Sequence, residues 1–325
     1  MTVHVARYTY RGRTEWGVIR AGAITPIGAE LATTANLVEH ASARDLSSLT
    51  GPTLDEGEVK LLSPITRNQQ FVCQGANYRS HMLESGIDPD AKAFNMIFRK
   101  ASSCIVPADS DVIRPPHVAL LDYEIELGLV LKRNLTEQEK ITHENLHQVI
   151  AGVTIVNDYS ARDVQIPQMQ FYKGKSYRTF GPVGPYLCLL GPQDMHYLRE
   201  LRLTLSVNGE TRQDATTDDL VFSPAETLSE LSGVQDLHAG DLIATGTPSG
   251  CALRIPSPGV QRVASLLPEA LRWKAFHRAQ AKRSEYLQPG DVVESRAAST
   301  DGVVDLGLQR NRVVLAGEGG QHHEA

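Results

Sequence analysis

The chain has 325 residues, a formal net charge of −6 and 41% hydrophobic residues, which is ordinary for a globular protein that buries a full core. It has no run of Lys or Arg that could follow nucleic-acid phosphates, and no stretch as apolar as the roughly 18 residues of a membrane span. Its first residues lack the basic and apolar blocks of a signal peptide, so we expect a cytoplasmic protein with a small-molecule partner, no nucleic acid and no membrane.

Residues 1–65 are expected to form a small N-terminal β domain. Two runs of alternating apolar residues, VHVARYTY and WGVIRAGAITPI, flank the turn-prone segment RGRTE, which predicts a short hairpin or small sheet. The segment LLSPITRNQQ then supplies the proline and polar residues of a linker. We therefore place a domain boundary near residue 65.

The main domain, residues 66–318, is expected to be a β-rich α+β fold. Strand-like runs recur along it: VALLDYEIELGLVLK, VIAGVTIVND, VGPYLCLLG, LRLTLSVNG, DLIATGT, DVVESRAAS and VVDLGLQRNRVVL. Helical patterns are fewer, in YRSHMLESG, TEQEKITHENLHQVIAG and FSPAETLSELSG. Residues 254–284 are a basic, helix-prone insertion, either a surface excursion or a lid or dimer contact. The tail, residues 319–325, is expected to be disordered.

Three carboxylates predict a metal site. In DYEIELGLVL, strand alternation places Glu124 and Glu126 on the same face, roughly 6 to 7 Å apart at the backbone. At an effective dielectric near 20 their charges repel by about 2 to 3 kcal/mol, which a bound cation removes; alone, the pattern also fits a solvated strand face. Asp158 ends the apolar run VTIVND, where a carboxylate needs a partner. Oxygen ligands suit Mg²⁺, with Mn²⁺ or Ca²⁺ as alternatives, and three of them leave positions for water and substrate.

Six motifs occur in an order that is typical of one enzyme family: GANYRSHMLESG, DYEIELGLVL, NDYSARDVQ, GKSYRTFGPVGP, TGTPSG and LQPGDVVES. Over roughly residues 66–316 the chain resembles the fumarylacetoacetate hydrolase family. The resemblance implies that family's catalytic fold, a β-sandwich roll of mixed sheets, and a homodimer. It also implies a metal held by the residues that match Glu124, Glu126 and Asp158, which the spacing argument reaches independently.

A general base is expected on the first of these motifs. His81 and Glu84 are three residues apart, so on a helical turn they share a face, and the carboxylate can orient and charge-stabilise the imidazole. Such a pair is usually solvated when it stands alone. The resemblance favours the catalytic interpretation, because several family members carry a His–Glu pair on a lid that closes over substrate.

The resemblance also implies groups around the substrate: Lys175 as a catalytic residue, and Arg162, Gln165 and Thr247 as substrate-binding residues. Tyr78 and Arg178 are further candidates for substrate binding. A cation held by packing, such as Lys175 or Arg162, stabilises a developing oxyanion better than water does. The alternative for Arg162 is a salt bridge to Asp163 or another carboxylate, and Thr247 also fits a simple turn. Arg178 stands where many family members have an Asp, which adds a second cation near Lys175 and suggests a substrate with an extra carboxylate.

The preferred hypothesis is a divalent-metal-dependent hydrolase that cleaves a carbon–carbon bond in an acylpyruvate or related 1,3-dicarbonyl acid. His81, oriented by Glu84, would activate water. Lys175, with Arg162 or Gln165, would stabilise the oxyanion. The same residues can stabilise an enolate without water attack, so an isomerase, a tautomerase or an oxaloacetate-type decarboxylase is the alternative. A metal-stabilised binding protein without turnover is a further alternative from another class.

Overall fold

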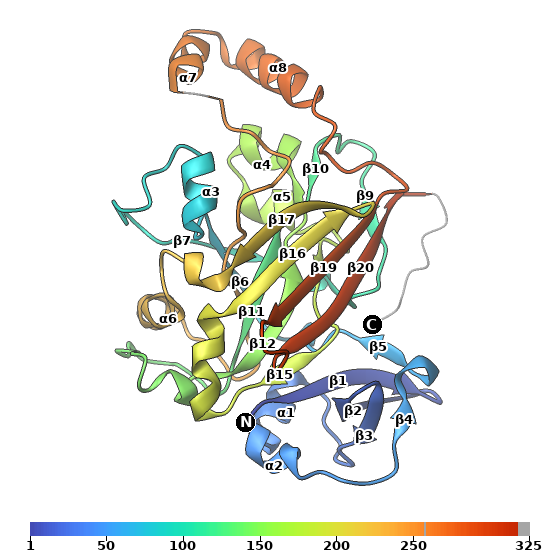
Figure 1. Ribbon diagram of the computed structural model, residues 1–325. Helices are drawn as coiled ribbons and strands as arrows, with labels where there is room; N and C mark the ends of the chain where they lie inside the picture. Colours follow the sequence, from blue (N-terminus) through green and yellow to red (C-terminus); the bar gives the residue numbers. More distant parts are fainter. Residues whose placement is uncertain (257, 318–325) are drawn as a thin grey trace.

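The computed structural model describes residues 1–256 and 258–317, and the tail expected to be disordered, 319–325, lies outside them. Figure 1 shows the N-terminal strands at one end of the molecule and helices α7 and α8 projecting at the other, with the sheets of the main domain between them. Within the described part of the chain, no helix is long and apolar enough to cross a membrane.

The predicted N-terminal hairpin is present. Strand β1 (Val3–Tyr10) pairs with β2 (Arg13–Arg20), and β2 pairs with β3 (Ala23–Pro26). Each connecting turn has positive φ at both of its residues, as a type I′ turn requires. The remaining elements of this segment are α1 (Thr34–His40), α2 (Ala43–Ser47), β4 (Leu54–Asp55), the 3₁₀ helix η1 (Glu56–Glu58) and β5 (Lys60–Leu62).

An 11-stranded sheet runs through the whole molecule in the order β4-β3-β2-β1-β15-β12-β11-β18-β6-β7, with β5 paired to β1. The N-terminal strands join it through β1 and β15, where Val3 faces Leu189. Every residue of β11 and β12 is buried, so both faces of these central strands are covered. After residue 65 this sheet takes in β6 (Phe71–Gly75), β7 (Met96–Lys100), β11 (Ile125–Leu131), β12 (Ile150–Asn157), β15 (Leu187–Leu189) and β18 (Leu242–Ala244).

A five-stranded sheet, in the order β17-β16-β19-β20-β9, packs on β11 and β12 and encloses the largest apolar core. Its strands are β9 (Val112–Arg114), β16 (Leu201–Val207), β17 (Glu210–Thr216), β19 (Val292–Ser299) and β20 (Asp305–Leu315). Two short ladders complete the mixed-sheet, α+β architecture that was predicted: β10 (Leu121–Asp122) with β13 (Ser160–Ala161), and β8 (Ile105–Val106) with β14 (Gly181–Pro182).

Helices border the sheets. They are α3 (Arg79–Glu84), α4 (Arg162–Gln168), α5 (Phe171–Lys175), α6 (Pro224–Ser232), α7 (Pro258–Ser265) and α8 (Glu269–Gln280). The 3₁₀ helices are η2 (Ser102–Cys104), η3 (Leu146–Gln148), η4 (Pro192–Arg199) and η5 (Thr217–Asp219). The predicted helices at α3 and α6 are confirmed, and the insertion at 254–284 carries α7 and α8.

The helix predicted over residues 136–152 is wrong. That segment contains only η3, and β12 begins at Ile150. The backbone of this segment forms hydrogen bonds to side chains of α6 instead. The N–H groups of Glu139 and Ile141 donate to the hydroxyls of Ser232 and Ser229, respectively. Tertiary hydrogen bonds have therefore replaced the helical ones.

Candidate metal centre and catalytic cavity

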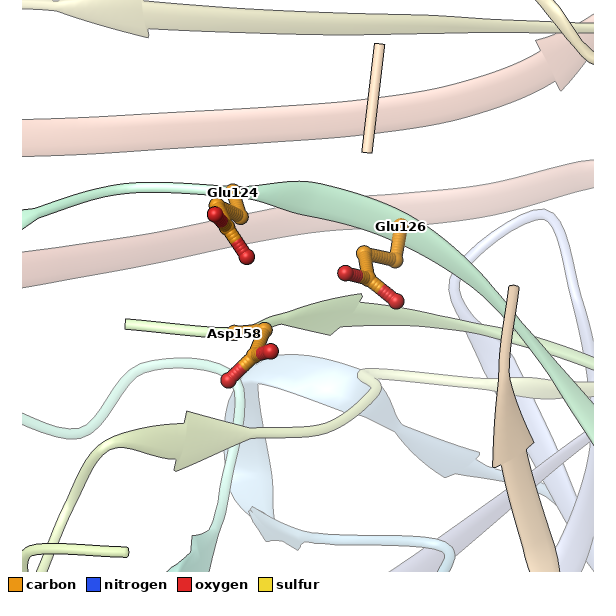
Figure 2. Close-up of side chains that lie close together, drawn as sticks. All are labelled: Glu124, Glu126 and Asp158. Carbon is orange, nitrogen blue, oxygen red and sulfur yellow. The ribbon is translucent and has the colours of Figure 1, made fainter. Parts of the chain in front are cut away.

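Glu124, Glu126 and Asp158 converge in the interior. Each offers an oxygen within 4.8 Å of the other two, and all three side chains are buried. Figure 2 shows Glu124, just before β11, and Glu126, within it, projecting from the same side of the chain toward Asp158. The register of β11 and β12 pairs Ile125 with Asn157, and the Asp158 N–H donates to the Glu124 carbonyl at 2.8 Å. Strand pairing therefore brings the two acidic motifs to one point.

Two buried lysines compensate part of this charge. Lys175 Nζ lies 2.5 Å from Glu124 Oε2 and 2.7 Å from Asp158 Oδ2. Lys100 Nζ lies 2.5 Å from the other Asp158 oxygen and 2.7 Å from the Phe180 carbonyl. Sequence reasoning missed Lys100. Its only signal is a lysine at the end of the apolar strand β7, where a charge needs a partner.

Lys175 reaches the site because its helix approaches α4 closely. A Cβ on Gly174 would lie only 2.8 to 2.9 Å from Gln165 backbone and Cβ atoms, so a larger residue would push α5 away. Burial opposes the charged form of Lys175, but the Asp158 and Glu124 carboxylates raise its pKa above the ordinary value. The lysine is therefore a fixed cation beside the acidic residues.

Arg162 forms a salt bridge to carboxylates other than Asp163. Its Nε donates to Asp122 Oδ2 at 2.8 Å and one terminal nitrogen to Glu124 Oε1 at 2.5 Å. Its other terminal nitrogen donates to Gln165 Oε1 at 2.7 Å. Burial opposes ionisation of Glu124, but the Arg162 and Lys175 charges hold the pKa of Glu124 below its usual range.

Glu126 is the carboxylate of this group that lacks a cation. It accepts the Gly246 N–H at 2.9 Å and has no ion-pair partner among the described residues. Burial raises its pKa well above the ordinary value, and the Asp158 and Glu124 charges raise it further. Gly246 has φ +90, and a Cβ there would press on Asn77, so glycine allows this N–H to face the carboxylate.

The charge balance fits a divalent cation. With every carboxylate ionised, the four buried acidic residues Asp122, Glu124, Glu126 and Asp158 face three buried cations, Lys100, Arg162 and Lys175, which leaves a formal charge of minus one for a bound cation to balance. The unpaired donors are hard carboxylate oxygens, and such a set suits Mg²⁺, Mn²⁺ or Ca²⁺. We call these seven residues the floor of the site.

His81 and Glu84 of α3 face the floor but do not form a close pair. Nδ1 of His81 lies 3.9 Å from Glu84 Oε2, beyond hydrogen-bond range, and no described residue bonds to this buried nitrogen. Burial lowers the pKa of His81, although the Glu124 charge opposes this, so the imidazole is neutral at pH 7. Glu84 accepts the Gly250 N–H at 3.1 Å and forms an ion pair with Arg254. Sequence reasoning also missed Arg254.

His81 and Glu84 line a cavity of about 140 Å³. Its polar lining includes Glu124, Glu126, Lys175, Arg162, Gln165 and Thr247. Met96, Phe98, Ile166, Leu253 and Ile255 supply apolar walls. The volume is well below the roughly 300 to 1,000 Å³ of sites for drug-sized ligands, so it suits a small molecule. A larger hollow of about 780 Å³, beside Tyr186 and the N-terminal strands, is lined by none of the predicted site residues.

Three predicted substrate-binding residues differ in their placement. Thr247 lines the cavity, but its hydroxyl already donates to the Ile125 carbonyl at 2.8 Å and accepts from Gln213. Tyr78 is fully buried in the main core and is not part of the lining. Arg178 is exposed after α5, so the structure does not bring it to the cavity. The second cation close to Lys175 is Lys100, since both bind Asp158.

Comparisons with known proteins agree on one family. A model described as "Fumarylacetoacetate (FAA) hydrolase C-terminal" matches residues 70–314. The oxaloacetate tautomerase YisK of Bacillus subtilis is 39% identical over 196 residues, which cover 59% of this chain and 63% of YisK, a little under two thirds of that relative. A 2,4-didehydro-3-deoxy-L-rhamnonate hydrolase of a Sphingomonas species is 31% identical over 94% of both chains. The solved fumarylacetoacetate hydrolase of Exiguobacterium antarcticum superposes with a TM-score of 0.74 at 27% identity, covering 97% of this chain and 100% of that one.

Proposed function

This chain belongs to the fumarylacetoacetate hydrolase family, and on that premise we propose that it is a divalent-metal-dependent tautomerase that interconverts the keto and enol forms of a small 2-oxo acid such as oxaloacetate. One observation carries the proposal: a neutral imidazole, His81, lines the same small cavity as Lys175 and two carboxylates of the acidic cluster, Glu124 and Glu126. The similarity to YisK supports the choice of reaction.

Glu124, Glu126 and Asp158 would hold the cation. When bound, it would polarise the substrate's oxo group and favour the enolate over the ketone. Lys175 keeps the two ligands that it contacts in place and offers a fixed positive charge to the developing enolate oxygen. Arg162, held by Asp122 and Gln165, is preorganised in the same way.

His81 would move the proton. Because the ring is neutral and no described residue bonds to Nε2, this nitrogen can accept a proton from the carbon beside the oxo group and deliver it to the enolate oxygen, or carry it the other way, which leaves Nδ1 for a carboxylate partner. The reaction requires no water in the cavity, in keeping with the modest volume of about 140 Å³. Gln165 and Thr247 complete the polar lining on the substrate side.

Cleavage of a carbon–carbon bond in an acylpyruvate is the second candidate. It is favoured by the match over 94% of both chains to a protein named as a hydrolase, and by the presence of both His81 and Glu84 on the cavity wall. Hydrolysis would need the imidazole, oriented by Glu84, to activate water. We place hydrolysis second because the relative named as a tautomerase is 39% identical over its match, whereas the one named as a hydrolase is 31% identical.

The test compares three reactions on the purified protein with Mg²⁺. Enol oxaloacetate is followed by its ultraviolet absorbance, decarboxylation by release of CO₂, and acylpyruvate cleavage by product identification. The tautomerase proposal expects metal-dependent loss of the enol signal without CO₂ release. Rapid acylpyruvate cleavage, with oxaloacetate tautomerisation at the rate of buffer alone, would replace it with the hydrolase.

A further inference from the structure

We propose that Arg254 binds a second anionic group of the substrate, distal to its 2-oxo acid end, and that this contact releases Glu84 to pair with His81. The inference rests on the proposed function and deepens it, because it assigns the substrate class as oxo-dicarboxylates. We call four residues the rim of the site: His81, Glu84, Arg254 and Ile255.

Arg254 is anchored by its backbone, and its half-exposed side chain pairs with Glu84. Gln280 of α8 bonds to the Arg254 backbone, donating to its carbonyl at 2.8 Å, while Asp122 accepts the N–H of the preceding Leu253 at 3.0 Å. The neighbours Leu253 and Ile255 both line the cavity. The Arg254 side chain is 45% exposed, so the guanidinium can change partner while its backbone stays in place.

Three groups compete for one carboxylate. Glu84 Oε2 accepts the Gly250 N–H, and Oε1 pairs with Arg254. His81 Nδ1, only 3.9 Å from Oε2, is left buried without any bond to a described residue. Hydrogen bonds of this kind are about 2.7 to 3.2 Å long. Once the ion pair with Arg254 breaks, a side-chain rotation of Glu84 therefore brings its carboxylate within hydrogen-bond distance of His81 Nδ1.

The charge of the floor explains why a distal anion needs Arg254. The floor carries one net negative charge, which a divalent cation and one substrate carboxylate together neutralise. A second carboxylate in the same small cavity would stand uncompensated, at a high cost. Arg254 is the half-exposed cation next to this cavity, and a guanidinium matches a carboxylate with two parallel hydrogen bonds.

Kinetics with two substrates test the binding role. Oxaloacetate is compared with its 4-monomethyl ester, which keeps the 1-carboxylate and oxo group but loses the distal charge. Arg254→Met should raise KM for oxaloacetate about 10- to 100-fold and leave KM for the ester unchanged. It should also raise kcat for the ester, because Glu84 is then already free. Arg254→Lys should fall between, and Arg278→Met, an exposed charge of the same insertion, should behave as wild type.

The outcomes separate the two proposals. If wild type turns over neither compound, the proposed function fails. If it turns over both and Arg254→Met keeps the wild-type ratio of KM values, the function stands and the Arg254 inference is overturned. A merely structural role would lower kcat for both substrates alike.

A second measurement needs neither metal nor turnover. The ¹⁵N resonance of His81 Nδ1, assigned with His81→Gln in the metal-free protein, reports whether that nitrogen is hydrogen-bonded. Arg254→Met should shift it toward the bonded value, whereas Arg278→Met should not. An unmoved resonance in folded Arg254→Met would overturn the release of Glu84. If that variant does not fold, Arg254→Lys is used, for which a weaker shift of the same sign is expected.

Discussion

The floor and the rim of the site differ in how completely their charged side chains are paired and buried. On the floor, Lys175 touches two carboxylates, Lys100 a third oxygen, and the side chains are at most 7% exposed. At the rim, Glu84 and Arg254 are 19% and 45% exposed, and His81 has an unused nitrogen. The floor is built on paired central strands, whereas the rim comes from a short helix and a loop. The charges of the floor are thus paired inside the fold, whereas the groups of the rim lie where they can exchange partners with a ligand.

Glu126→Gln should break the floor most completely. Glu126 is the proposed ligand without a cationic partner, and the raised pKa of its carboxyl means that a bound cation is what would favour its ionised form, which a neutral amide cannot supply. We expect Mg²⁺ affinity to fall at least about 100-fold and turnover to vanish, with the fold intact. Calorimetric titration measures the affinity, and Glu137→Gln, an exposed carboxylate, is the control. An unchanged Mg²⁺ isotherm would remove the proposed metal centre.

Lys100→Met tests whether the floor is a balanced ionic network. Lys100 and Asp158 are both fully buried, and removing one partner of such a pair costs about 3 to 5 kcal/mol of unfolding free energy. Urea unfolding of the metal-free protein should show this loss, and Mg²⁺ should restore part of it by compensating Asp158. Lys274→Met, which changes an exposed lysine of α8, is the matched control. A loss below about 1 kcal/mol would contradict the network.

His81→Gln tests the role of the rim imidazole as the general base. A general base contributes roughly 100- to 10,000-fold, so we expect tautomerisation to fall by about 100-fold while Mg²⁺ affinity stays unchanged. Burial lowers the pKa of His81 below the ordinary 6.5, so the imidazole stays neutral in mildly acidic solution. Wild-type kcat/KM should therefore begin to decline only at a pH below 6.5. If the variant retains full activity while Lys175→Met is inactive, proton transfer does not pass through this imidazole.

The floor was largely predictable because its signals are local. Glu124 and Glu126 stand at the start of β11 and Asp158 directly follows β12, so only the pairing of these two strands had to be supplied by the fold. Lys100 and Arg254 were not predictable in this way. Each meets its partner, Asp158 or Glu84, across the tertiary structure, and neither stands in a pattern that marks it.

Resemblance and local propensity also failed at specific places. Arg178 follows a motif that matches the family, but its side chain is exposed and away from the cavity. The helix expected over 136–152 was displaced by hydrogen bonds from Ser229 and Ser232, which no periodicity encodes. The domain boundary near residue 65 and the homodimer stay predictions, and β1 joins its sheet to β15 of the main domain.

Glu84→Gln should give the smallest effect, and it distinguishes the free rim from the occupied one. In the free protein Arg254 shares the Glu84 carboxylate and His81 lies 3.9 Å away, so the charge acts on the imidazole weakly. Partly exposed ion pairs contribute about 0.2 to 1 kcal/mol, which corresponds to a change of less than about one unit in the pKa of His81. A carboxylate favours imidazolium, so its loss moves the acid limb to lower pH. The profile of kcat/KM reports the free enzyme and that of kcat the complex. If the substrate draws Arg254 away, the limb of kcat should therefore shift further than that of kcat/KM; equal shifts would mean that Glu84 meets His81 no more closely in the complex than in the free protein.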